Sequence, residues 1–130
     1  MTTRDRTRII VSVGAKNPTT LSLRWSDGTA ADLPFPPQGA EIGEWGHSVV
    51  WPDGTERSAD SLWLETLTAT GHADARRFLE WRLSHGLSLS AAAEALGISR
   101  RMVAYYSNGE KPVPRPILLA CRGWETERAA

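Results

Sequence analysis

The spacing of apolar side chains changes once along the chain, near residue 71. Before it, Leu-Ser-Leu-Arg-Trp at residues 21–25 alternates with the period of two that is typical of a half-buried β-strand. After it, Ala75, Phe78, Leu79 and Leu83 recur with the period of about 3.6 that places side chains on one face of a helix. We therefore expect a sheet-forming first domain, residues 1–70, and a helical second domain, residues 71–130.

The first domain is predicted to contain a small antiparallel sheet. Its strands are expected at residues 8–13, 21–25, 29–33 and 48–51. Asp27-Gly28 favours a tight hairpin turn, because glycine accepts positive φ, and this turn would place the second and third strands side by side. Residues 34–47 are rich in proline and glycine and are expected to form a loop.

Two further patterns complete the prediction for this domain. The sequence Trp-x-Asp-Gly-Thr occurs at residues 25–29 and 51–55, and we interpret it as two strand-ending turns of similar chemistry. Ser58 or Asp60 can cap one short helix with four apolar residues, Leu62, Trp63, Leu64 and Leu67. Residues 68–72, Thr-Ala-Thr-Gly-His, are the expected hinge to the second domain.

The second domain is predicted to be all helical. Helices are expected over residues 74–85, 89–96, 100–107 and 117–124, the last of them after an extended segment at 111–116. Ser88 and Ser99 can cap the second and third helices, and Gly97 and Gly109 can end them. Leu118 and Cys121 are expected to face inward from the final helix.

The second and third of these helices form a helix-turn-helix arrangement, whose packing requires particular residue types at fixed offsets. The helices cross at a small residue, Ala93, and the turn needs a residue with permissive φ, Gly97. The second helix needs a β-branched anchor, Val103. The remaining inward positions hold Ala92, Leu96, Ile98 and Tyr106.

With these motifs, residues 78–124 resemble the lambda-repressor-like class of helix-turn-helix domains, which includes Cro and the phage repressors. The similar stretches are Trp-Arg-Leu-Ser-His-Gly-Leu-Ser at 81–88, Ala-Ala-Glu-Ala-Leu-Gly-Ile-Ser at 92–99, and Asn108-Gly109 followed by Pro112. The first half is similar to a small bacterial α+β domain of unknown function that can precede such a domain. The predicted fold is therefore α+β: a small antiparallel sheet with one helix, followed by an all-α lambda-repressor-like domain.

The resemblance implies that the second helix of the motif enters the DNA major groove. Its predicted base-reading residues are Ser99, Arg100, Arg101, Ala104 and Tyr105. Arginine suits this role because its guanidinium can bond guanine O6 and N7 together. We expect Arg100 and Tyr105 to project away from Val103 more directly than Arg101 does. The alternative is that the two arginines are only the solvated face of a helix.

Contacts to DNA phosphates are predicted at the ends of the motif helices, from Ser88, Ser90, Asn108 and Lys111. Leu89 stands where phage repressors often place a polar side chain, so Ser90 or a backbone amide is expected to make that contact. For Asn108 the alternative is a plain helix cap.

Charge separates along the chain although the totals balance. Fifteen Lys and Arg residues meet fifteen Asp and Glu residues, for a net charge of zero. Residues 1–71 hold six basic and nine acidic residues, 6 − 9 = −3, whereas residues 72–130 hold nine and six, 9 − 6 = +3. The positive half is the helical one, which favours contact with a polyanion there.

Catalysis, metals and membranes find little support in the sequence. The histidines, His47, His72 and His85, stand at no metal-ligand spacing, and neither a nucleophile elbow nor a phosphate-binding glycine loop is present. We expect no enzyme, no cofactor and no metal. The single cysteine, Cys121, and an apolar N-terminal run too short for a signal peptide or a membrane span favour the cytoplasm. The four tryptophans before residue 71 are expected to fill a small core.

These expectations combine into a sequence-specific transcriptional regulator, expected to act as a repressor, that binds double-stranded DNA as a homodimer. The alternative is an antitoxin-like or adaptor protein whose first domain binds a protein partner.

Overall fold

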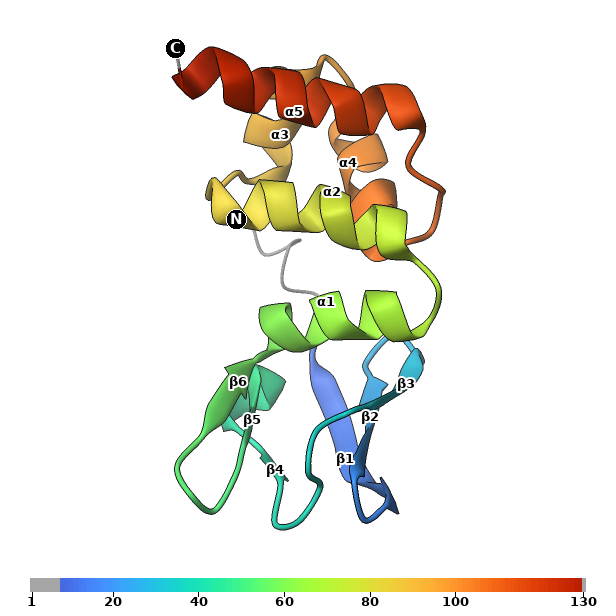
Figure 1. Ribbon diagram of the computed structural model, residues 1–130, viewed down its shortest axis with the longest axis vertical. Helices are drawn as coiled ribbons and strands as arrows, with labels where there is room; N and C mark the ends of the chain where they lie inside the picture. The colour runs from blue at the N-terminus through green and yellow to red at the C-terminus, as the bar shows by residue number, and fades with distance from the viewer. Residues whose placement is uncertain (1–7, 130) are drawn as a thin grey trace. The chain divides into compact units, whose positions relative to one another are not determined.

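The structure, a computed structural model, describes residues 8–129 and divides into two compact units, one ending at Thr70 and the other beginning at Gly71 (Figure 1). The described residues form an α+β fold with two small antiparallel sheets and five α-helices. Each unit is described by itself.

The first unit contains both sheets. One has the order β1-β2-β3, with β1 Ile10–Asn17, β2 Thr20–Trp25 and β3 Ala30–Leu33. The other has the order β4-β5-β6, with β4 Glu41–Ile42, β5 Ser48–Val50 and β6 Glu56–Ser58. A 3-10 turn, η2 Glu44–Gly46, lies between β4 and β5, and α1 Ala59–Ala69 follows β6.

The prediction of one sheet is wrong. The prolines after β3 interrupt pairing, so the chain starts a second sheet within residues 34–47, which were expected to be a loop. That sheet includes β6, whose sequence Glu-Arg-Ser has no apolar alternation to reveal it. The first strand also extends to Asn17, because it pairs with β2 as far as the Asn17 and Thr20 partners.

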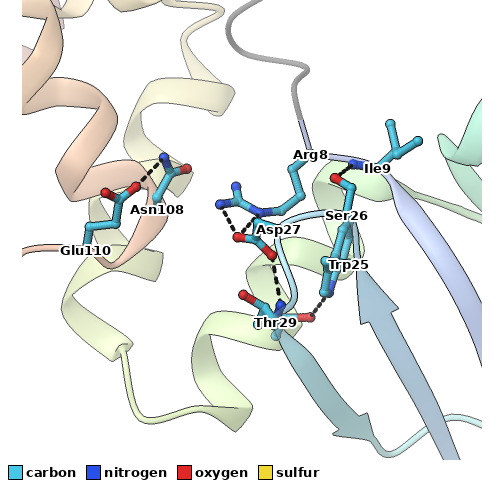
Figure 2. A network of polar contacts seen from close by, with 9 residues as sticks. Arg8, Ile9, Trp25, Ser26, Asp27, Thr29, Asn108 and Glu110 are labelled. Atoms are coloured by element: carbon cyan, nitrogen blue, oxygen red, sulfur yellow. Dashed lines mark hydrogen bonds and ion pairs between the residues drawn. The ribbon is translucent and has the colours of Figure 1, made fainter.

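The predicted pair of similar turns is confirmed. In the first, Trp25 N–H donates to the Thr29 carbonyl at 2.8 Å and Thr29 N–H donates to Asp27 Oδ1 at 2.9 Å (Figure 2). The second, at residues 51–55, repeats both bonds at the same distances. Gly28 and Gly54 have φ of 93° and 91°, which only glycine adopts without strain. Each turn joins the last two strands of its sheet.

Helix α1 packs against β3 and β6 and so covers both sheets. Ser58 caps it, because the Ser58 hydroxyl accepts a hydrogen bond from Ser61 N–H at 3.1 Å. Inside the unit, Trp25 Nε1 donates to Thr66 Oγ1 at 3.1 Å, and the Trp25 and Trp63 rings meet edge to face at 5.2 Å. These contacts fasten the first sheet to the helix.

Trp45 departs from the expectation that the tryptophans of the first half fill a core. Trp25, Trp51 and Trp63 are buried, but the Trp45 side chain is 78% exposed. Its backbone is left-handed, with φ of 59°. Besides the three buried tryptophans, the core of this unit contains aliphatic side chains from both sheets and from α1, chiefly Leu21, Leu23, Leu33, Val49, Leu62 and Leu67.

The second unit contains α2 Ala73–Ser84, α3 Leu89–Leu96, α4 Arg100–Asn108 and α5 Arg115–Ala129 (Figure 1). The first three helices are confirmed within one or two residues at each end. The fourth is longer than predicted, because Pro116 falls in its first turn, where a helix tolerates proline. On α2, Arg82 is buried, whereas Leu83 is half-buried. No helix in the described part of the chain has both the length and the apolarity that a bilayer crossing requires.

Candidate nucleic-acid interface

Helices α3 and α4 are held at a fixed angle by the turn between them. Gly97 has φ of 71° and ψ of 32°, and both Gly97 N–H and Ile98 N–H donate to the Ala93 carbonyl, at 2.8 and 3.1 Å. Each helix starts at a serine: Ser88 Oγ accepts from Ala91 N–H and Ser99 Oγ accepts from Met102 N–H, both at 3.0 Å. The C-terminal end of α3 and the N-terminal end of α4, which meet at this turn, thus each have a local hydrogen bond.

The residues predicted as motif core have the placement that their packing role requires. Val103 is completely buried and Ala93 is 7% exposed. Around them lies one apolar cluster that also includes Phe78, Trp81, Leu89, Ala92, Tyr106, Val113 and Cys121, with Leu96 and Ile98 packed against it. The Phe78 ring meets the Tyr106 ring edge to face at 5.5 Å, which joins α2 to α4.

Arg82 joins the helices from inside the unit, and the sequence analysis did not identify it. This side chain is 5% exposed. Its Nε donates to the Leu87 carbonyl at 3.0 Å and its guanidinium donates to Ser107 Oγ at 2.8 Å. The Ser107 hydroxyl in turn donates to the Val103 carbonyl at 2.7 Å. The segment before α3 is thereby tied to α4. The spacing could have indicated that Arg82 faces the core, because it follows Phe78 by four residues and so lies on the same face of the helix.

The outward face of α4 carries the predicted base-reading residues. Arg100 and Arg101 are exposed, and neither makes an ion pair within residues 8–129. Ala104 and Tyr105 are half-buried, and Ser99 is exposed at the cap. A helix turns by about 100° per residue, so these side chains form one stripe along α4.

The expected order of projection within this stripe is wrong for Arg101. Two residues separate Arg101 from Val103, which places their side chains about 160° apart around the helix axis. Tyr105 stands at the same angle on the other side, whereas Arg100 is only about 60° from Val103. Arg101 and Tyr105 therefore point most directly away from the core, and Arg100 lies toward the edge of the exposed face.

The residues predicted to contact phosphates lie at the helix ends, and they differ in exposure and in hydrogen bonding. Ser90 is exposed. Ser88 uses its oxygen as an acceptor for the cap, which leaves its O–H as a donor. Asn108, the last residue of α4, donates from its side-chain amide to the Glu110 carboxylate at 3.3 Å (Figure 2). Lys111 Nζ lies 5.1 Å from the centre of the Tyr105 ring, so a predicted phosphate contact touches a predicted base-reading residue.

Leu89 belongs to the core of the unit. It is 7% exposed and lies in the apolar cluster beneath the motif. The Leu89 side chain therefore offers no polar contact, and a contact to phosphate from Ser90 or from a backbone amide at the start of α3 stays a prediction. The DNA contacts assigned to all of these residues stay predictions.

The histidines have local structural surroundings. His47 ends η2, and its backbone N–H donates to the Glu44 carbonyl at 3.1 Å. His85 Nε2 lies 2.9 Å from a Glu125 carboxylate oxygen, with its ring on Trp124. Within residues 8–129, no three His, Cys, Asp or Glu side chains are grouped so that they could hold a metal ion.

Comparison with known proteins gives one informative similarity. No family model and no curated protein matches the chain. A solved structure does: "Crystal Structure of Putative DNA Binding Protein NE0471 from Nitrosomonas europaea ATCC 19718". The two sequences are 36% identical, the match covers 93% of this chain and 88% of the other, and the TM-score is 0.63.

Proposed function

The chain belongs to the same protein family as NE0471 of Nitrosomonas europaea, and on that premise we propose that its second unit binds double-stranded DNA. In this proposal α4 enters the major groove and the protein regulates transcription by occupying its site, without catalysis. The second unit is assigned to the lambda-repressor-like class, on the resemblance of residues 81–99.

One observation carries the proposal: the exposed face of α4 presents Arg100 and Arg101, both without an ion pair within the described chain. An arginine that only interacts with solvent does not need a helix fixed in one position. Here the caps, the Gly97 turn and the Arg82 bonds all fix the backbone of α4, so the positions from which the two arginines project are set before DNA arrives. Such preorganisation lowers the entropy cost of recognition.

The charge of the unit supports the same assignment. Residues 72–130 carry a net charge of +3. Lys111, just beyond α4, is the one cation among the predicted phosphate contacts, so one subunit would give a salt slope of about −1 through it. A homodimer on two half-sites roughly one helical turn apart would approach twice that slope. Leu119, exposed on α5, is our candidate for the dimer contact.

The experiment is selection of bound sequences from random duplex DNA with the full chain, followed by fluorescence anisotropy at several salt concentrations. We expect an enriched motif and an affinity that falls as salt rises. Absence of any binding at low salt contradicts the proposal. Binding without an enriched motif would limit the protein to a sequence-independent role.

A second candidate function has its own observation. An antitoxin-like or adaptor protein would use its first unit to bind a protein partner, and the exposed Trp45 in that unit favours it. The two functions are compatible, because they use different units of the chain.

A further inference from the structure

Two features single out Trp45 within residues 8–129. It is 78% exposed, and it is the one non-glycine residue with positive φ within residues 8–129. A side chain with a Cβ is disfavoured in this left-handed region. Neither burial nor an easy backbone conformation therefore explains a tryptophan here. Local backbone strain of this kind is found chiefly where a side chain must be presented for a function.

The turn that presents Trp45 is fixed on both sides. Gly43 N–H donates to the Ser48 carbonyl at 2.8 Å, and Gly46 N–H donates to the Gly43 carbonyl at 3.1 Å. Gly46 lies so close to the first strand that a Cβ there would stand 2.8 Å from the Ile10 carbonyl oxygen. The indole is consequently held out from a closely packed turn.

Beside the indole lies a hollow of about 470 Å³, within the range of small-ligand sites. It is lined by Glu44, Trp45, His47, Ser48, Glu56 and Ser58. The two carboxylates form no ion pair within residues 8–129. Ser48 is 6% exposed, and its hydroxyl makes no hydrogen bond within the same residues. The hollow therefore offers an aromatic face, two negative charges and an unused hydroxyl.

The first unit already holds a guanidinium with such groups. Arg8 places its guanidinium carbon 3.7 Å from the centre of the Trp63 ring and donates to Asp27 Oδ2 at 2.8 Å (Figure 2). Trp45 with Glu44 and Glu56 supplies the same two kinds of contact, but no cation from residues 8–129 lies over this ring. Arginine fits better than lysine, because a planar guanidinium can stack on the indole and donate to carboxylates in its own plane.

We propose that the hollow beside Trp45 binds an arginine side chain presented by a basic segment of a partner protein. The net charge of −3 over residues 1–71 attracts such a segment and repels nucleic acid. The inference deepens the second candidate function and does not depend on DNA binding by the second unit.

The test titrates the isotopically labelled full chain with the peptide acetyl-Gly-Arg-Gly-Arg-amide and follows the tryptophan indole signals by NMR. The Trp45 signal is assigned from its absence in Trp45→Phe. We expect it to shift saturably, while the buried Trp25 signal stays in place. A peptide with citrulline for arginine, which keeps the shape and loses the charge, is expected to give no saturable shift.

Single-charge variants locate the contact. Glu44→Gln or Glu56→Gln is expected to weaken peptide binding roughly two- to fivefold, the range of one exposed charge pair. Glu41→Gln, on exposed β4 outside the hollow, is the matched control and is expected to leave the affinity within the error. DNA affinity, measured on the same samples, is expected to stay unchanged, which separates this proposal from the first.

Any of four results would overturn the proposal. One is no Trp45 shift at any peptide concentration. Another is an equal response to the citrulline peptide, or an equal loss in Glu41→Gln, since either would mean that no specific charge contact forms. The last is dissociation of an oligomer by Trp45→Ala in sedimentation, which would assign the indole to a contact between copies of this chain.

Discussion

Replacing Arg82 by alanine tests whether this buried side chain holds α4 in position. The substitution removes donors from the Leu87 carbonyl and the Ser107 hydroxyl, in a region where Arg82 is 5% exposed. Hydrogen bonds from a charged donor contribute about 1.5–3 kcal/mol each, and the released cost of burying the guanidinium offsets part of their sum. We expect a net loss of about 2–4 kcal/mol in the free energy of unfolding.

The assay is urea denaturation followed by far-ultraviolet circular dichroism, because four of the five α-helices in the described chain lie in the second unit. Arg82→Met keeps much of the apolar stem, so we expect it to lose about 1–2 kcal/mol less than alanine. Arg77→Ala, at an exposed position of the same helix, is the control and should change stability by less than about 0.5 kcal/mol. A loss in Arg82→Ala no larger than in Arg77→Ala would refute the reasoning.

Three further predictions concern a carboxylate, a thiol and the hinge. Burial alone would raise the pKa of Asp27, but hydrogen bonds from Thr29 N–H and Arg8 outweigh it and lower the pKa below 3.8. Asp27 therefore binds a proton more readily in the unfolded chain than in the folded one. For this reason the wild type should have a larger free energy of unfolding than Asp27→Asn above about pH 4. This difference in the free energy of unfolding should vanish as the pH falls through the pKa of Asp27 in the folded protein. A difference that grows as the pH falls would contradict the prediction. Burial, followed by the Glu125 carboxylate, raises the pKa of the Cys121 thiol to about 12. Ellman's reagent at pH 8 should accordingly react slowly until urea unfolds the chain, and fast labelling of the folded protein would argue against it. Limited proteolysis should cut first within residues 68–72 and leave two folded fragments; first cuts elsewhere would mean that this hinge is protected.

The helical unit was the more predictable half because its signals are local. Ser88 and Ser99 cap helices within three residues of themselves, and Gly97 ends one by its own backbone conformation. Such features depend on neighbours in sequence, so they can be recognised without knowing the fold. The twin turns at Asp27 and Asp53 were predictable for the same reason.

The features that the sequence did not reveal depend on distant contacts. Strand β6 is polar throughout and exists because β5 and the turn at residues 51–55 bring it into register. Arg82 is buried because Leu87 and Ser107 supply acceptors that only the packed helices bring near. The exposure of Trp45 follows from the turn between β4 and β5, in a segment whose prolines and glycines predicted only a loop.

Replacement of Arg101 distinguishes base reading by α4 from binding to the DNA backbone alone. The measurement compares the affinity of Arg101→Ala and Lys111→Ala for the selected duplex and for a scrambled one, after circular dichroism has shown that both variants are folded. Arg101→Ala should lose about 1–3 kcal/mol on the selected site alone and relax the base preference there. Arg100→Ala should lose less, because its side chain lies at the edge of the exposed face. Lys111→Ala should weaken both duplexes about equally and lower the salt slope by about one. If folded Arg101→Ala keeps its full preference for the selected site, α4 does not read the bases.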